Sequence, residues 1–202
     1  MIVFIEYQYF PPVTLFSYLK GFSHCIFFEY DEFRKMSFRN RCVIAGANGP
    51  INLTVPVRGG RNQRILSKEV EIDNRIAWQL NHWKSICSCY NHSPWFEHYK
   101  HSLLEIFETR YEKLIDLNLA AFRWTIAQLN ISTTWETGSV PVDKAFEDLR
   151  NRLMPKLLTA LPTNVEYRQV FQEQIGFLPH LSILDLLFCT GMKAHSILEF
   201  GV

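Results

Sequence analysis

Short apolar runs separated by polar turns fill the first 75 residues, and this pattern predicts strands. Two such runs are residues 2–5 and His24–Phe28, and a helix over Thr14–Lys20 is expected between them, after the Pro11-Pro12 stop. This part of the chain therefore predicts the order strand, loop, helix, strand.

Two further apolar runs, Cys42–Ala45 and Ile51–Val57, follow with Asn48-Gly49-Pro50 between them. An Asn-Gly pair between two such runs favours a tight hairpin. A polar loop is expected over Gly59–Asn62, and the alternation around 70–72 predicts one last strand.

From Ile76 onward the apolar positions recur every three or four residues, which predicts helices. They are expected over 76–90, from an N-cap at Ser93-Pro94 through Phe107, and over Tyr111–Leu129. Residues 132–145 combine Gly, Pro, Ser and Thr, so they predict a linker.

A charged helix broken at Pro155 is expected over Asp143–Leu158, and a final helix begins near Leu181. The predicted fold class is therefore α/β, with a mixed α+β N-terminal part over 1–75 and a mainly α-helical part over 76–202. Together these parts are expected to form one domain.

The composition permits a large core. The net charge is too small to draw the protein onto nucleic acid or anionic lipid. The 202 residues are 48% hydrophobic with 16 Phe, enough to bury a sizeable core, and the net charge is +1. Near-zero charge disfavours nucleic-acid binding. With neither a basic n-region nor an apolar stretch of membrane-spanning length, and with five scattered cysteines, we expect a cytoplasmic protein with reduced thiols and no membrane span.

The segment Glu29–Arg41 carries three acidic residues and then four cations. Arg39 and Arg41 would share one face if this segment is extended, and two converging guanidiniums suit a phosphate or a carboxylate. Lys35 and Asn40 lie within the same segment as further ligand-binding candidates. The alternative is a solvated loop in which acids and bases pair with each other.

Two residues are candidates for proton transfer. Glu6 ends the first predicted strand, where a carboxylate could act as a general base or orient an arginine. His82 and Lys84 flank Trp83, a member of an apolar helix stripe, so they would face away from that stripe and supply a proton donor and a cation. The alternative is an ordinary polar helix surface.

Motifs that would identify a cofactor are missing. Glu97, His98 and His101 do not form the His-Glu-x-x-His pattern of zinc proteases, so no metal site is predicted. The sequence also lacks a phosphate-binding loop, a dinucleotide glycine motif and a nucleophile elbow. No cofactor follows from the sequence.

Several ordered motifs along the chain resemble the WbqC-like family of bacterial proteins, in particular its members from Bacteroidetes-type genomes. The motifs are Glu6–Pro12, Ser37–Cys42, Leu53–Val57, His82–Ile86, Tyr90 with Ser93-Pro94, Asp116–Asn118 and Leu178–Phe188. This family takes its name from a gene of surface-polysaccharide (O-antigen) clusters. The resemblance therefore implies glycan-precursor chemistry, with a nucleotide sugar or another anionic small molecule as the ligand.

The resemblance also implies that separate segments converge on one pocket, with Asp116 and Asn118 orienting groups beside Arg39 and His82. Two features depart from the family pattern. Glu6-Tyr7-Gln8 stands where many members have His-Gln-Pro, and the Gly-rich loop expected before the last motif is missing from Pro162–Ile175.

Two hypotheses follow. The first is a transferase that moves an acyl, aminoacyl or related group to a nucleotide-linked sugar, with the cations holding the anion and Glu6 or His82 moving a proton. The second is a non-catalytic binding or assembly protein, in which the same charges form an internal ion-pair network; the two departures favour it. An open cleft at Arg39 favours the first hypothesis, whereas buried and neutralised arginines favour the second.

Overall fold

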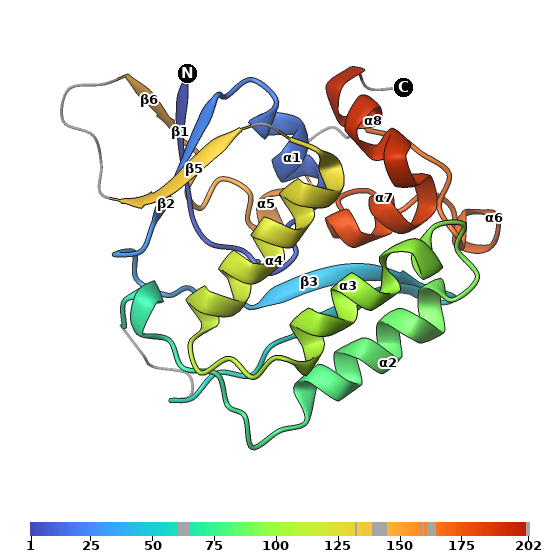
Figure 1. Cartoon of the computed structure of the whole chain (residues 1–202), viewed down its shortest axis with the longest axis horizontal. Helices are drawn as coiled ribbons and strands as arrows, with labels where there is room; N and C mark the ends of the chain where they lie inside the picture. Colours follow the sequence, from blue (N-terminus) through green and yellow to red (C-terminus); the bar gives the residue numbers. More distant parts are fainter. Residues whose placement is uncertain (60–64, 132, 139–144, 159, 161–164, 201–202) are drawn as a thin grey trace.

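Four parallel strands form the main sheet of the computed structural model, which describes residues 1–59, 65–131, 133–138, 145–158, 160 and 165–200. The strand order is β5-β2-β1-β6, and every neighbouring pair is parallel (Figure 1). The strands are β1 (Ile2–Ile5), β2 (His24–Phe28), β5 (Thr134–Gly138) and β6 (Phe146–Asp148).

Both faces of the two central strands, β1 and β2, are buried, as is usual for parallel sheets. Ile5 and Phe27 point into the main core, where the Phe27 ring packs on Phe122 with 4.7 Å between centroids. Phe4 and Ile26 alternate to the opposite face and are also buried. The near-continuous hydrophobicity of the two central strands follows from this double burial.

Helices pack beside the sheet and against one another, and a hairpin contacts two of them (Figure 1). The hairpin strands β3 and β4 are antiparallel and contact helices α2 and α7. The remaining main elements are α1 (Val13–Leu19), β3 (Arg41–Gly46), β4 (Gly49–Thr54), α2 (Trp78–Tyr90), α3 (Phe96–Glu108), α4 (Leu114–Leu129), α7 (Ile183–Thr190) and α8 (Ala194–Phe200).

The predicted α/β class is confirmed, and so are the first two strands, the hairpin and the long helices. The hairpin turn lies at Ala47-Asn48, with Gly46 paired to Gly49, one position before the predicted turn. Gly49 takes φ +124°, which explains why glycine follows the asparagine.

The C-terminal half differs most from the prediction. Within the predicted linker, residues 134–138 form β5 and pair with β2, whereas residues 139–144 lie outside the described residues. The helix predicted over 143–158 is wrong, because its place is taken by β6 and the short helix α5 (Pro155–Leu158). Strands from both sides of residue 75 therefore share one sheet.

Three local predictions also change. A 3₁₀ turn, η1 (Ser67–Glu69), and isolated bridges replace the strand predicted around 70–72. Helix α3 begins at Phe96 after Trp95, so Ser93 is not its N-cap. Most of the predicted loop at 59–62 falls outside the described residues, which end at Gly59 and resume at Ile65.

Candidate functional site

Three strands of the parallel sheet end at one edge and place polar residues there. Glu6 follows β1, Asp31 comes three residues after β2, and Arg150 with Asn151 follows β6. The chain adds β2 and β5 on one side of β1 and then returns with β6 on the other side. Such a topological switch point, at the carboxyl ends of parallel strands, is where open α/β sheets bind ligands.

Arg39 lies in a turn before β3, and its guanidinium reaches this carboxyl edge. Its Nη2 donates to Asp31 Oδ2 at 3.3 Å and to Asn151 Oδ1 at 3.1 Å. The side chain is 2% exposed. Burial lowers the pKa of Arg39, while the nearby Glu6 and Asp31 carboxylates oppose that change.

A second arginine and a second acid extend the network. Arg150 donates from Nη1 to Asp31 Oδ1 at 3.1 Å, and from Nε and Nη2 to the two oxygens of Asp148 at 2.9 and 2.7 Å. These bidentate bonds lower the pKa of Asp148 and raise that of Arg150. Asp31 therefore bridges Arg150 and Arg39.

Glu6 is buried beside the same loop. Its Oε2 accepts from the backbone N–H of Asn151 at 3.0 Å, and its Oε1 accepts from Gln8 Nε2 at 3.0 Å. The network therefore contains the carboxylates of Glu6, Asp31 and Asp148. Against these three stand two guanidiniums, those of Arg39 and Arg150. The positive charge of the network is already neutralised from within.

Several buried polar atoms beside this network make no hydrogen bond within the described residues. They include Nε and Nη1 of Arg39, Oδ1 of Asn118 and Oγ of Ser67. These three residues line one cavity of about 10 Å³, together with Tyr7 and Phe33. Two donors, an acceptor and a hydroxyl around so small a space suit one hydroxyl group or one water molecule.

The remaining candidates from the arginine segment do not converge on this cavity. Because Arg39 lies in a turn, it does not share a face with Arg41, whose Nη2 contacts Met36 Sδ at 3.0 Å. Asn40 is buried and donates to the Val55 carbonyl, which ties the turn to the end of the hairpin. Lys35 is exposed.

On helix α4 the two candidates separate. Asn118 is buried and donates from Nδ2 to the Arg39 carbonyl at 2.8 Å, so it holds the turn that carries the arginine. Asp116 is exposed in the first turn of the helix. The structure thus brings Glu6, Arg39 and Asn118 together.

A comparison with protein-family models matches residues 7–155 to the WbqC-like protein family. This match covers well over half of the chain and includes the segments that carry Arg39, Asn118 and Asn151. The chain belongs to the WbqC-like protein family. A search of curated proteins and a search of solved structures returned no match.

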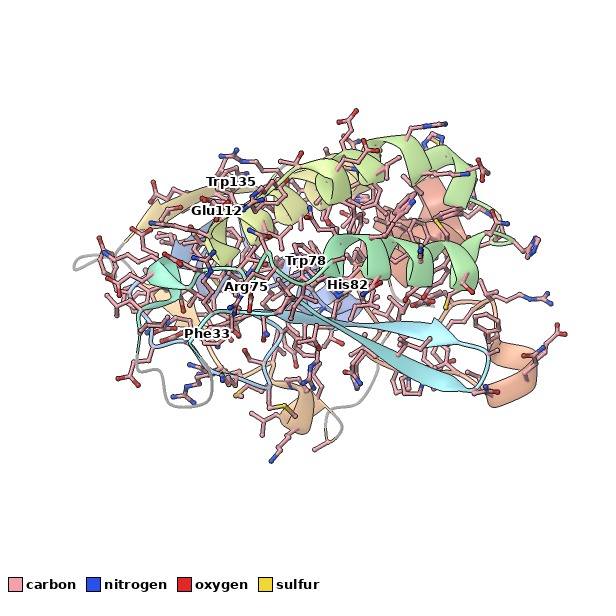
Figure 2. All side chains as sticks on the ribbon, turned by 90° about the horizontal axis from the view of Figure 1, so that it is seen from below. Phe33, Arg75, Trp78, His82, Glu112 and Trp135 are labelled. Atoms are coloured by element: carbon pink, nitrogen blue, oxygen red, sulfur yellow. The ribbon has the colours of Figure 1, made fainter. Side chains whose placement is uncertain are left out.

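In this WbqC-like protein His82 lies in the core and not at the cavity. Figure 2 shows it beside Trp78 on helix α2, and the ring centroids are 5.3 Å apart. Its Nε2 donates to the Thr54 carbonyl at 3.3 Å, and its Nδ1 therefore accepts from the Tyr9 hydroxyl at 3.0 Å. With both ring nitrogens engaged, we infer a structural role for His82; the neighbouring Lys84 is exposed.

Burial lowers the pKa of His82 to about 4. Between that value and its usual one near 6.5 the unfolded chain binds the proton and the folded chain does not, so stability falls as the pH drops through this window. We expect His82→Gln to abolish this loss, which amounts to ~1.4 kcal/mol per pH unit. Urea denaturation at pH 7, 6 and 5 measures it.

The variant His92→Gln is the control, because His92 is exposed at the end of helix α2. It should keep the wild-type pH profile. If His82→Gln also keeps that profile, the histidine is not buried in its neutral form and the assignment to the core is wrong.

Sequence reasoning missed several members of the network in this WbqC-like protein. Arg150 and Asn151 fell inside a predicted helix, because Phe146–Asp148 is too short and too polar to predict a strand. Ser67 belongs to no motif that would have marked it as a candidate site residue. Asp31 was noted only as one acid of a charged loop, although its position after an apolar strand is a usable signal.

Among the described residues, no group of three or more His, Cys, Asp and Glu side chains is placed to hold a metal ion. In the same part of the chain, no helix combines the length and the apolar character that a membrane crossing requires.

Proposed function

We propose that this WbqC-like protein binds a nucleotide sugar at the carboxyl edge of its sheet and acts in bacterial surface-polysaccharide biosynthesis. The observation that carries the proposal is the cavity beside Arg39. A sugar hydroxyl would accept from the guanidinium and donate to Asn118 Oδ1, so it matches the unpaired atoms.

The phosphates of such a ligand would remain outside the cavity. The two arginines of the network pair with its carboxylates, so we place the phosphates at Arg34 and Lys35, which are exposed and directly follow Phe33 in the chain. Exposed cations next to a polar cavity suit a ligand with a diphosphate at one end and hydroxyls at the other.

The reaction that we propose is the transfer of an acyl, aminoacyl or related group from an activated donor to a hydroxyl of the bound sugar. The hydroxyl oxygen forms the new bond as it loses its proton, and the bond between the group and the donor's leaving group breaks. Proton transfer would fall to Glu6 rather than to His82. Glu6 accepts from Asn151, which also bonds Arg39, and each carboxylate oxygen has a second lone pair, whereas both nitrogens of His82 are engaged in the core. Because the hydroxyl in the cavity donates its one hydrogen to Asn118, Glu6 would act as general base on another hydroxyl of the same sugar.

A second candidate function is favoured by the pairing of Arg39 with Asp31 and Asn151. In this reading the charges hold the strand ends together, and the chain is a non-catalytic binding or assembly protein. It accounts for the excess of carboxylates over guanidiniums, since buried arginines that are already paired need no anionic ligand.

Titration calorimetry with UDP-glucose, UDP and glucose separates the two functions. We expect saturable binding of UDP-glucose, tighter than that of UDP. Ser67→Ala should weaken UDP-glucose about fivefold and leave UDP unchanged, because it removes one hydrogen-bonding group from the sugar end. Stability should change little, since the Ser67 hydroxyl has no partner among the described residues.

Two further variants complete this test. Lys35→Gln should weaken UDP-glucose and UDP equally, because both carry the diphosphate. Arg152→Gln is the control, since this exposed arginine lies just beyond Asn151 but not at the cavity. If UDP-glucose, UDP-N-acetylglucosamine and dTDP-glucose all fail to bind, the second candidate function replaces the first.

A further inference from the structure

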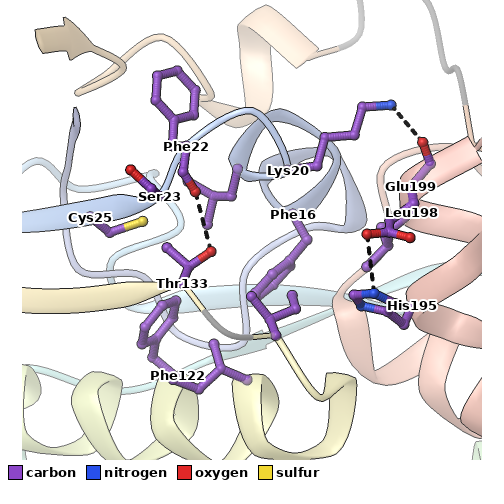
Figure 3. Close-up of a pocket in the computed structure, with 13 residues that line it drawn as sticks. Phe16, Lys20, Phe22, Ser23, Cys25, Phe122, Thr133, His195, Leu198 and Glu199 are labelled. Carbon is purple, nitrogen blue, oxygen red and sulfur yellow. Dashed lines mark hydrogen bonds and ion pairs between the residues drawn. The ribbon is translucent and has the colours of Figure 1, made fainter. Parts of the chain in front are cut away.

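A second cavity lies away from the proposed sugar site, at the other end of the sheet. Its walls come from α1, from the start of β2, from the C-terminal half of α4 and from α8 (Figure 3). Its volume is about 240 Å³. The lining residues Phe22 and Ser23 come just before β2, and Cys25 lies at its start. The cavity therefore adjoins the amino end of the sheet and not the carboxyl edge.

Most of the residues that line this cavity are apolar. Buried side chains from four separate segments line it, and the residues that define its interior are Phe16, Leu19, Phe22, Cys25, Phe122 and Leu198. Burial raises the pKa of the Cys25 thiol to about 12, so the thiol remains neutral. No charged group among the lining residues is buried, so the interior excludes an ionic group.

Lys20, His195 and Glu199 lie on one side of the cavity, whereas the polar residues Ser23 and Thr133 lie on the other (Figure 3). Lys20 and Glu199 are exposed, and Lys20 Nζ donates to the Glu199 carbonyl at 3.2 Å. The Glu199 carboxylate lies 3.2 Å from His195 Nε2, which fixes that imidazole. The second ring nitrogen, His195 Nδ1, is buried and makes no hydrogen bond within the described residues.

We propose that this cavity binds the acyl chain of a medium-chain fatty acid or of its thioester, with the carbonyl end at Lys20 and His195. A mainly apolar lining, with a cation and an imidazole on one side, is the form of a site for an amphiphile. A dry cavity of about 150 Å³ accepts a six-carbon ring, so by proportion about 240 Å³ accepts roughly ten carbons.

The carbonyl end would find two partners. Lys20 supplies an ammonium that can donate to a carboxylate or carbonyl oxygen. His195 donates from Nε2 to the Glu199 carboxylate, so its Nδ1 is an acceptor, which would take the hydrogen of a protonated carboxyl group. Because this site is formed by other residues than the cavity at Arg39, it does not depend on the proposed sugar site.

A chain-length series tests the proposal on the unaltered protein. We expect the affinity for saturated fatty acids, measured by calorimetry, to rise about fourfold per methylene from four carbons and to level off near ten. A flat series, or no binding of decanoate at all, overturns the proposal. Decanoate and decanoyl-pantetheine are compared directly, and the tighter of the two identifies the free acid or the thioester as the source of the chain.

Two pairs of variants locate the site. Ile126→Trp fills the cavity from helix α4 and should reduce decanoate binding at least tenfold, whereas Leu119→Trp, also partly buried on that helix, should not. Lys20→Met should weaken decanoate two- to fivefold but leave decanol unchanged, because only the carboxylate uses the ammonium. Unchanged binding in Ile126→Trp places the chain elsewhere and overturns the proposal.

Discussion

Gly191→Ala is expected to destabilise the protein by about 3–5 kcal/mol, the largest effect of any single-methyl change that the structure suggests. Gly191 ends helix α7 at φ +56° and ψ −129°, a conformation that side-chain-bearing residues rarely adopt. A Cβ at this position would also overlap the indole ring of Trp95. Both the backbone and the ring would have to move.

The backbone that carries this ring is held in place, because the N–H of Trp95 donates to the carbonyl of Phe188 on α7 at 3.0 Å. Thermal unfolding followed by circular dichroism should show a midpoint about 10 °C lower. Gly21→Ala is the matched control, since nothing lies within 4 Å of its added methyl. A Gly191→Ala midpoint equal to that of Gly21→Ala would show that the helix junction tolerates a side chain.

Asp185→Leu is expected to cost about 3–5 kcal/mol at pH 7, because it breaks a buried network and leaves two hydroxyl groups unpaired. Asp185 lies on α7 and is fully buried. Its Oδ1 accepts from the Tyr90 hydroxyl at 2.6 Å, and its Oδ2 accepts from the Tyr167 hydroxyl at 2.7 Å. Tyr90 in turn accepts from the backbone N–H of Ala45, so the network joins α2, α7 and the hairpin.

Unfolding in urea measures this loss, and a triple variant separates its causes. The loss of stability can come from the two tyrosine hydroxyls that no longer have an acceptor. In that case, adding Tyr90→Phe and Tyr167→Phe to Asp185→Leu should restore much of the lost stability. A triple variant no more stable than Asp185→Leu alone would assign the cost to packing and contradict the network.

The pH dependence gives an independent check on the same residue. Burial raises the pKa of Asp185 to about 6, so between that value and its usual one near 4 the folded chain binds the proton and the unfolded chain does not. The contribution of this group to stability therefore increases as the pH falls through this window. Asp185→Asn should lack that gain, which totals about 3 kcal/mol.

The local pattern of apolar and polar residues was sufficient to predict the strands and helices that have a clear hydrophobic repeat. Strands β1 and β2 are apolar runs because both of their faces are buried, and the long helices show a repeat of three to four because one face is buried. Arg39 also emerged from the sequence, as a cation in a charged loop after a strand. The family resemblance drew attention to Asn118 as well.

The rest depended on pairings between residues far apart in the chain. The strand β6 is three residues long and polar, and it is a strand only because β1 pairs with it. Arg39 and Asn151 stand 112 residues apart, and only the sheet order brings them into contact. Periodicity compares near neighbours in sequence, so it cannot detect such a pairing.

The sequence by itself determined the α/β class, the central strands and the main helices, and it selected the turn at Arg39 as a candidate site. The tertiary structure decided that this arginine is buried and paired with Asp31, that His82 belongs to the core, and that two cavities lie at opposite ends of the sheet. The physical reason is that burial, charge pairing and cavities are properties of surfaces that meet only after the chain has folded.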